Sequence, residues 1–232
     1  MEPAEGVIPA EDCLRSDLSV DRDSFSIALS PDPLVAYLGL RYCSNVECRL
    51  KVHYFCREEV DPGTNLKTFR TSIGPIAQPI EIYLPPAHHE PIPEASIPIP
   101  FDALEDLIPC TESEAIIPML IEISPIDGFN AQAEISYLSF THERDLWKPK
   151  LQKQLFFLRN RYFLLHELYG APREREERVE CVVCMSEKRT VVVLPCRHVC
   201  ICAHCAKVMS RKKGGKCPIC RALVESFMQL GV

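Results

Sequence analysis

Apolar and polar residues alternate most regularly between Val46 and Cys56, where six positions two residues apart are apolar or cysteine. The positions between them include charged residues such as Arg49 and Lys51. A period of two indicates a strand with one buried and one solvated face. Shorter stretches of the same kind predict further strands at 25–29, 34–42, 79–84, 118–123 and 131–140. We therefore expect residues 23–147 to form an antiparallel β-sandwich-like domain in which 34–42 and 46–56 pair as a hairpin.

Prolines are concentrated in residues 75–125, which hold eleven of the twenty in the chain. Proline lacks an N–H donor and has a fixed φ, so strands in this region must be short, interrupted or at a sheet edge. Residues 85–100 are predicted to form an extended, polyproline-like surface loop. His88 and His89 lie in this loop, where we expect them to be exposed and without a role.

The apolar period changes to three and four residues in 148–170. The apolar stripe consists of Leu151, Leu155, Leu158, Tyr162, Leu165 and Tyr169. Pro149 suits the first turn of a helix, and Gly170 suits the position after the last turn. The pattern predicts an amphipathic helix over 148–170 that packs on the sheet domain, followed by a charged linker over 171–180. The expected fold class is α+β.

Composition limits the classes to which the protein can belong. The 232 residues are 47% hydrophobic and 25% charged, which is typical of a folded globular chain. No apolar run approaches the ~18–20 residues of a membrane-spanning helix, so no transmembrane segment is expected. Residues 1–22 are interpreted as a flexible leader without a secretory signal, and Glu2 excludes N-myristoylation of the chain as written. These features predict a cytoplasmic protein.

Charge is divided unevenly along the chain. Residues 187–232 carry nine Lys/Arg and two acids, and because the whole chain has a net charge of -6, the remainder is at about -13. The basic cluster at 211–216 lacks interleaved aromatic residues for base stacking. Together with the acidic front of the chain, this argues against nucleic acid as a partner.

Cysteines form the strongest motif, since eight of the thirteen lie in residues 181–220. Three Cys-x2-Cys pairs and one Cys-x-His pair supply eight candidate metal ligands: Cys181, Cys184, Cys196, His198, Cys202, Cys205, Cys217 and Cys220. Zinc takes four such ligands in a tetrahedron, so eight ligands complete two closed structural sites. Disulfides and ordinary buried thiols are the disfavoured alternatives in a reducing compartment. Cys200 is left over and is interpreted as a small buried residue rather than a catalytic thiol.

This spacing resembles the RING finger that has seven cysteine ligands and one histidine. The resemblance implies interleaved sites, with one Zn²⁺ on Cys181, Cys184, Cys202 and Cys205 and the other on Cys196, His198, Cys217 and Cys220. It also implies that the RING, residues 181–221, docks a ubiquitin-charged E2 conjugating enzyme. The implied contact residues are Val183, Met209, Pro218 and Arg221, the last one bridging E2 and ubiquitin. Residues 222–232 are expected to be a C-terminal tail.

The segment KPKLQKQLFFLRNRYFLLHELYG, followed by a charged linker and a ring with HVCIC, is similar to the mahogunin family of RING ubiquitin ligases. DRDSFSIAL, VECRLKVHYFC and EAIIPMLIEIS are similar to the strands of that family's β-rich domain. The resemblance implies a substrate or adaptor domain within residues 23–170. It also implies a place at endosomes or the plasma membrane, although the Met-Gly acylation signal and the Pro-Ser/Thr-Ala-Pro peptide are missing.

Two functions of different classes follow. The first is an E3 ubiquitin-protein ligase that promotes ubiquitin transfer from an E2 to substrate lysines, with no covalent catalytic residue of its own. The alternative is a zinc-stabilised protein-interaction scaffold without ligase activity. Met209 and Arg221 favour the ligase, because a degenerate ring needs neither. A homodimer is left open by the sequence.

Overall fold

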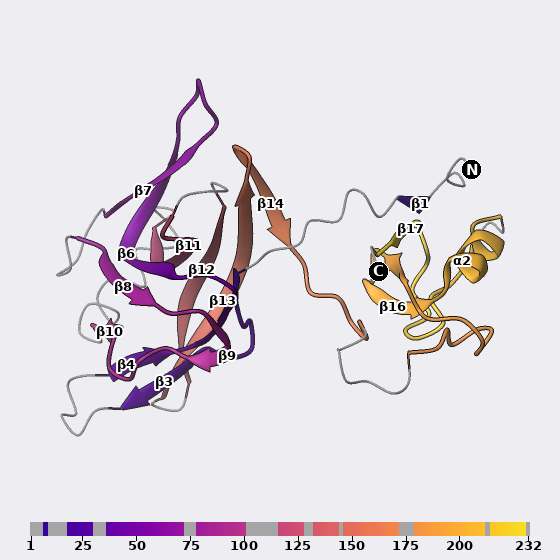
Figure 1. Ribbon diagram of the computed structural model, residues 1–232, viewed down its shortest axis with the longest axis horizontal. Helices are drawn as coiled ribbons and strands as arrows, with labels where there is room; N and C mark the ends of the chain where they lie inside the picture. Colours follow the sequence, from indigo (N-terminus) through magenta and orange to yellow (C-terminus); the bar gives the residue numbers. More distant parts are fainter. Residues whose placement is uncertain are drawn as a thin grey trace. The chain divides into compact units, whose positions relative to one another are not determined.

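The computed structural model describes residues 7–8, 18–29, 36–71, 78–100, 116–127, 132–143, 146–171, 179–211 and 214–230 (Figure 1). The chain divides into two compact units. One is Ser16–Leu165, and the other combines Met1–Arg15 with His166–Val232. Each unit has a buried core of its own. Within the described ranges, no helix is long and apolar enough to cross a membrane.

The large sheet of the Ser16–Leu165 unit has seven described strands, all paired antiparallel, in the order β14-β13-β12-β11-β6-β7, with β8 also paired to β6. Their bounds are β6 Cys48–Val60, β7 Lys67–Thr71, β8 Ile80–Leu84, β11 Ile117–Pro125, β12 Ala133–Glu143, β13 Leu146–Leu158 and β14 Arg161–Leu165. β6 is the central strand, because β11 pairs along one side of it while β7 and β8 divide the other side between them.

Two smaller sheets, β10-β4-β3 and β2-β5-β9, complete the described strands of this unit. Their bounds are β2 Leu18–Val20, β3 Ser26–Leu29, β4 Ala36–Gly39, β5 Arg41–Ser44, β9 Ala87–Pro91 and β10 Pro98–Ile99. Leu40 alone separates β4 from β5, and its carbonyl accepts a hydrogen bond from the N–H of Ile92 at 3.0 Å. The middle strands of the two small sheets, β4 and β5, are therefore almost continuous in the sequence.

The core of this unit lies between the small sheets and one face of the large sheet. Alternate residues of β6 face it, beginning with Cys48, Leu50 and Val52, none of which is exposed. Leu38 and Tyr42 approach from the small sheets and belong to the same cluster. The predicted alternation is present only from Cys48 to Val52, because His53 to Cys56 are all buried and no solvated face remains there. The chain is mostly β-sheet.

The helix predicted over 148–170 is wrong. These residues form most of β13 and all of β14, which pair as a hairpin with Leu158 opposite Arg161. Arg159 and Asn160 form its two-residue turn at φ values of 49° and 61°. Positive φ at both central positions is the geometry that matches the twist of a tight hairpin. The apolar stripe that suggested a helix is also compatible with strands, because β13 alternates between exposed lysines and half-buried residues up to Leu151.

Three other expectations differ from the structure. Residues 18–20, assigned to the leader, form β2, and Leu18 and Val20 are buried in the core. The 85–100 segment contains β9 and β10 rather than a polyproline-like loop. The expected hairpin of 34–42 with 46–56 is absent from the described pairings, since β5 pairs with β2 and β9 whereas β6 pairs with β7, β8 and β11.

The second unit contains a four-stranded sheet in the order β1-β17-β15-β16 and the helix α2 (Figure 1). The bounds are β1 Val7–Ile8, β15 Val191–Leu194, β16 His198–Ile201, α2 Ala203–Ser210 and β17 Ser226–Gln229. β17 lies in the expected C-terminal tail and pairs with β15, while β1 pairs in parallel with β17. Two distant stretches of the chain therefore complete the sheet of the cysteine-rich module.

Candidate metal centre

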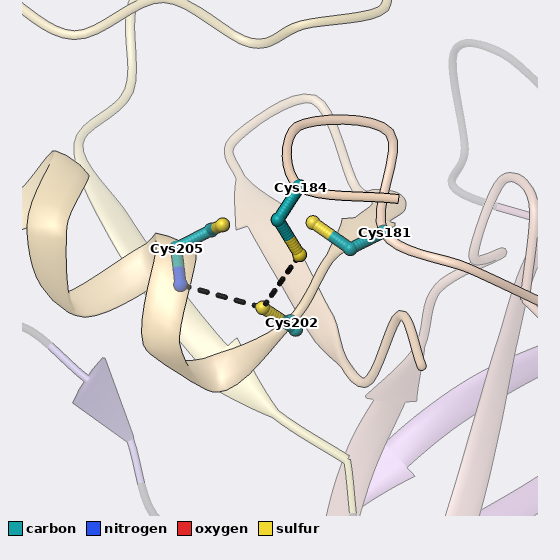
Figure 2. Close-up of side chains that lie close together, drawn as sticks. All are labelled: Cys181, Cys184, Cys202 and Cys205. Carbon is teal, nitrogen blue, oxygen red and sulfur yellow. Dashed lines mark hydrogen bonds between the residues drawn. The ribbon is translucent and has the colours of Figure 1, made fainter. Parts of the chain in front are cut away.

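Cys181, Cys184, Cys202 and Cys205 converge in the first cluster (Figure 2). Their four sulfur atoms lie within 4.8 Å of one another. The sulfurs of Cys184 and Cys202 are 3.8 Å apart, too far for a disulfide. Two sulfurs bound tetrahedrally to one zinc at about 2.3 Å each would be about 3.8 Å apart. The donor set and its spacing therefore fit zinc.

Local hydrogen bonds hold these sulfurs in place. Cys202 is the N-cap of α2, and its sulfur accepts a hydrogen bond from the N–H of Cys205 at 3.4 Å (Figure 2). The sulfur of Cys181 accepts from the N–H of Val183, also at 3.4 Å. Such bonds orient a ligand and favour its thiolate form, so the same groups that cap the helix and close the turn prepare the metal site.

Cys196, His198, Cys217 and Cys220 form the second cluster, also with donor atoms within 4.8 Å of one another. The Nδ1 atom of His198 is buried and has no hydrogen-bond partner among the described residues. A buried ring nitrogen without a partner is costly unless it binds something. Its place among three thiols is that of a nitrogen ligand to zinc, so the second cluster passes the same test.

The crowded thiols explain why a cation is needed. Burial, aided by neighbouring cysteines, raises the pKa of Cys196 and of Cys205 to about 11. Burial also raises the pKa of Cys181, but backbone N–H donors outweigh it and bring the value to about 6. Several thiolates cannot share such a small space without a compensating positive charge, and a bound divalent ion deprotonates the thiols it coordinates. The two clusters can hold two zinc ions, which would link the segments of chain that carry the ligands.

The module has little else to stabilise it. Ten buried residues form its core cluster, and five of them are cysteines: Cys181, Cys200, Cys202, Cys205 and Cys217. Ligand pairs of the two clusters alternate along the chain. Each zinc ion would therefore join two segments that are separated in the sequence by a ligand pair of the other ion. Zinc binding is therefore coupled to the folding of the whole module.

Cys200 is not part of either cluster. It is 2% exposed on β16 within the module's core, and burial raises the pKa of its thiol to about 12. A thiol of this kind is inert at neutral pH. This is the environment of a small buried residue.

Tyr169 contacts a metal ligand, which the sequence reasoning missed because it placed this residue at the end of a helix. Its N–H donates to the carbonyl of Arg197 at 3.0 Å, and its own carbonyl accepts from the N–H of Val199 at 2.8 Å. The rings of Tyr169 and His198 are 5.5 Å apart. Gly170 follows with φ 74°, a turn that glycine adopts readily. The feature of the sequence that could have pointed to Tyr169 is the Tyr-Gly pair, because glycine at 170 indicates a turn directly after the tyrosine.

The four residues expected to contact E2 lie on different parts of the module. Val183 and Pro218 are exposed within the first and last Cys-x2-Cys turns. Arg221 is exposed directly after the last ligand, at φ 62°, and its N–H donates to the carbonyl of Cys217 at 2.9 Å. Met209, near the end of α2, is half-buried and packs against the module's core.

Comparison with known proteins agrees with this description. The family model described as "Zinc finger, C3HC4 type (RING finger)" matches residues 177–227. The probable E3 ubiquitin-protein ligase LOG2 of Arabidopsis thaliana is 28% identical over 94% of this chain and 61% of its own length. E3 ubiquitin-protein ligase MGRN1 of Rattus norvegicus is 24% identical over 94% of this chain and 46% of its own length, and probable E3 ubiquitin-protein ligase LUL1 of Arabidopsis thaliana is 36% identical over 44% and 31%.

The chain thus spans less than two thirds of the length of these relatives. No solved structure gives a significant match. The resemblance predicted from the sequence is confirmed: residues 177–227 form a C3HC4-type RING finger, and most of the chain is similar to E3 ubiquitin-protein ligases of the mahogunin and LOG2 kind.

Proposed function

We propose that the protein is a RING-type E3 ubiquitin ligase of the cytoplasm, which binds a ubiquitin-charged E2 and promotes transfer of ubiquitin to substrate lysines. The observation that carries the proposal is the combination of two closed metal clusters with exposed apolar side chains in the turns that bind them. Val182, Val183 and Ile219 are 40%, 48% and 53% exposed. Exposed apolar side chains on turns that carry metal ligands are available to dock a partner protein.

The E2 would dock on this surface through Val183 and Pro218, one from each ligand turn. Met209 would contribute from α2, where its half-buried side chain joins the ring's core to the surface. Its neighbour Val208 is 44% exposed and extends the apolar area. Because the ligand turns are held by zinc, the surface is preorganised, and little ordering is needed on binding.

Arg221 would act after docking. Arg221 has an exposed side chain and a left-handed backbone conformation, and it directly follows the ligand Cys220. The metal cluster would therefore fix the position of its backbone. A guanidinium donates several hydrogen bonds in a planar fork, which lets it bridge carbonyls on E2 and ubiquitin at once. Holding the flexible ubiquitin in one orientation would prepare the E2 thioester for attack by a lysine. Catalysis would then come from positioning, with no covalent step on this chain.

The Ser16–Leu165 unit would select the substrate. A hollow of about 560 Å³ lies over β3 and β4, with small residues such as Ser26 and Gly39 on its lining and Arg41 and Glu94 as its charged groups. Its size falls in the range of pockets that take small ligands, and one positive and one negative side chain on the lining suit a polar segment of a protein. We place the protein-substrate contact of residues 23–170 here.

A ubiquitination reaction tests the proposal against the scaffold alternative. The full chain would be incubated with E1, ubiquitin, ATP and a panel of E2 enzymes, and ubiquitin chains or self-modification measured. We expect activity with at least one E2, and none for Cys202→Ser, in which the first metal cluster is broken. A folded, zinc-loaded parent protein that stimulates no E2 in the panel would favour the scaffold.

A further inference from the structure

The pairing of β9 with β5 contains a bulge that places two histidines side by side. Tyr42 pairs with Glu90 and Ser44 with Ala87, so Cys43 alone faces the two residues His88 and His89. Two residues opposite one disturb the alternation of side chains along a strand. His89 has φ 55°, an uncommon conformation for a residue other than glycine. As a result the rings of the two histidines are 4.6 Å apart, centre to centre.

Two further donor groups contact these rings. The sulfur of Cys43 is 3.2 Å from Nδ1 of His88. Nδ1 of His89 is 2.8 and 2.9 Å from the two carboxylate oxygens of Asp21. Asp21 follows β2 directly, and β2 and β9 flank β5 on its two sides. Three neighbouring strands therefore bring a thiol, two imidazoles and a carboxylate to one place on the surface of the Ser16–Leu165 unit.

We propose that Cys43, His88, His89 and Asp21 form a third zinc site, separate from the two ring clusters. Thiolate, imidazole and carboxylate are the three ligand types that zinc uses in proteins. A sulfur and a nitrogen bound tetrahedrally to one zinc would be about 3.5 Å apart, close to the 3.2 Å between Cys43 and His88. Both histidine side chains are exposed, so an ion can reach them from solvent.

This site differs from the ring in how it closes. Among the described residues, only the ring clusters hold three or more donor atoms within 4.8 Å of one another. The site at the bulge is completed when exposed side chains rotate, with Asp21 either binding the ion or orienting His89 as an outer partner. It therefore binds zinc more weakly than the ring does, and reversibly.

Zinc at this site would act on the substrate-binding unit. It would tie together β2, β5 and β9, which otherwise share only short ladders. Arg41 links the site to the hollow, because its Nη1 donates to the carbonyl of His89 at 3.1 Å and Arg41 is one of the residues that line the hollow. Zinc would fix the bulge and, through it, the position of Arg41.

Metal counting on the full chain tests the site. The protein would be purified with its ring zinc, equilibrated with a small excess of zinc and examined by native mass spectrometry. We expect three ions in the parent, two in Cys43→Ser and in His88→Ala, and three in the control His142→Ala, which removes an exposed histidine of β12. Cys202→Ser should lose ring zinc yet retain the ion at Cys43, which separates this proposal from the ring assignment.

Two results would overturn the third site. One is a parent protein that holds only two ions under excess zinc. The other is a third ion that persists in both Cys43→Ser and His88→Ala, which would place it elsewhere. Cobalt(II) provides a second readout in which the ring zinc is not removed. Cobalt(II) added to zinc-loaded protein should give a thiolate-to-cobalt absorption band in the parent, and this band should be missing in Cys43→Ser.

Discussion

Glu134 is a buried acid whose replacement by glutamine should stabilise the Ser16–Leu165 unit at neutral and alkaline pH. It is 3% exposed on β12, where its Oε1 accepts hydrogen bonds from the N–H of Val20 and from Nε2 of Gln154. Burial raises the pKa of Glu134 from 4.5 to about 7, against the opposing effects of the Val20 N–H and Arg22. The substitution Glu134→Gln would keep an acceptor oxygen at this place and remove the charge.

The sign of the effect follows from the raised pKa. Below pH 4.5 the acid is protonated in both the folded and unfolded states, and its contribution to stability is fully present. As the pH rises towards 7, only the unfolded state loses its proton, so the free energy of unfolding falls. The pKa values of the folded and unfolded states differ by about 2.5, and each pKa unit corresponds to about 1.36 kcal/mol. The free energy of unfolding therefore falls by about 3 kcal/mol by pH 8. Glu134→Gln should be more stable than the parent by about this amount there, and by much less at pH 5.

His53 titrates in the opposite sense. It is 5% exposed, neither ring nitrogen has a hydrogen-bond partner among the described residues, and burial together with Lys51 lowers its pKa from 6.5 to about 4. Its contribution is present above pH 6.5 and is lost as the pH falls towards 4. Between pH 4.5 and 6.5 the effects of Glu134 and His53 on the free energy of unfolding therefore oppose each other. His53→Leu removes one of them, so the stability of this variant should rise as the pH is lowered through this range, as expected from Glu134 alone.

Trp147 makes the measurement specific. It is the chain's one tryptophan and lies on β13, so its fluorescence reports unfolding of the Ser16–Leu165 unit in the intact chain. Urea midpoints at pH 5 and pH 8 would be compared for the parent, Glu134→Gln and His53→Leu. A midpoint for Glu134→Gln at pH 8 that equals or falls below that of the parent would refute the reasoning.

Other predictions concern the ring and the hairpin. Cys200→Ser should keep both ring zinc ions in native mass spectrometry, whereas Cys202→Ser should lose ring zinc and the protection of α2 in hydrogen exchange, since Cys202 is both ligand and N-cap. A strong chelator should remove that protection and leave the large sheet folded by Trp147 fluorescence; collapse of that signal would contradict two independent cores. Asn160→Gly should stabilise the β13–β14 turn by up to ~1 kcal/mol, because residue 160 has a positive φ. In the interior of a helix the same substitution would instead destabilise the protein, and urea unfolding gives the sign.

Ligand spacing could be read from the sequence because it is a local property. The two clusters that the structure brings together contain the same eight residues that the spacing singled out. Cys200 could be set aside for the same reason, since the pairs are complete without it. Tyr169 could not be found in this way, because its contact with His198 depends on how the chain runs before the ring.

Sheet structure was less accessible because strand pairing is a tertiary property. Leu151, Leu155 and Leu158 fit the apolar stripe of a helix. These residues form a strand instead because β12 pairs with them, and because the chain turns back at Arg159 and Asn160. Neither is visible in a local window. The bulge at His88 and His89 has the same character, since it exists only in relation to β5. Residues 101–115, also within the proline-rich region, lie outside the described residues.

The central claim is that the ring activates a charged E2, and single-turnover discharge of an E2–ubiquitin thioester onto free lysine tests it most directly. Parent protein should accelerate discharge. Arg221→Ala should retain zinc and E2 affinity but slow discharge by about tenfold to a hundredfold or more, as expected for the loss of one or two charged hydrogen bonds at ~1.5–3 kcal/mol each. Met209→Ala should instead weaken E2 binding. Discharge by Arg221→Ala at the parent rate, with E2 bound equally well, would contradict the account.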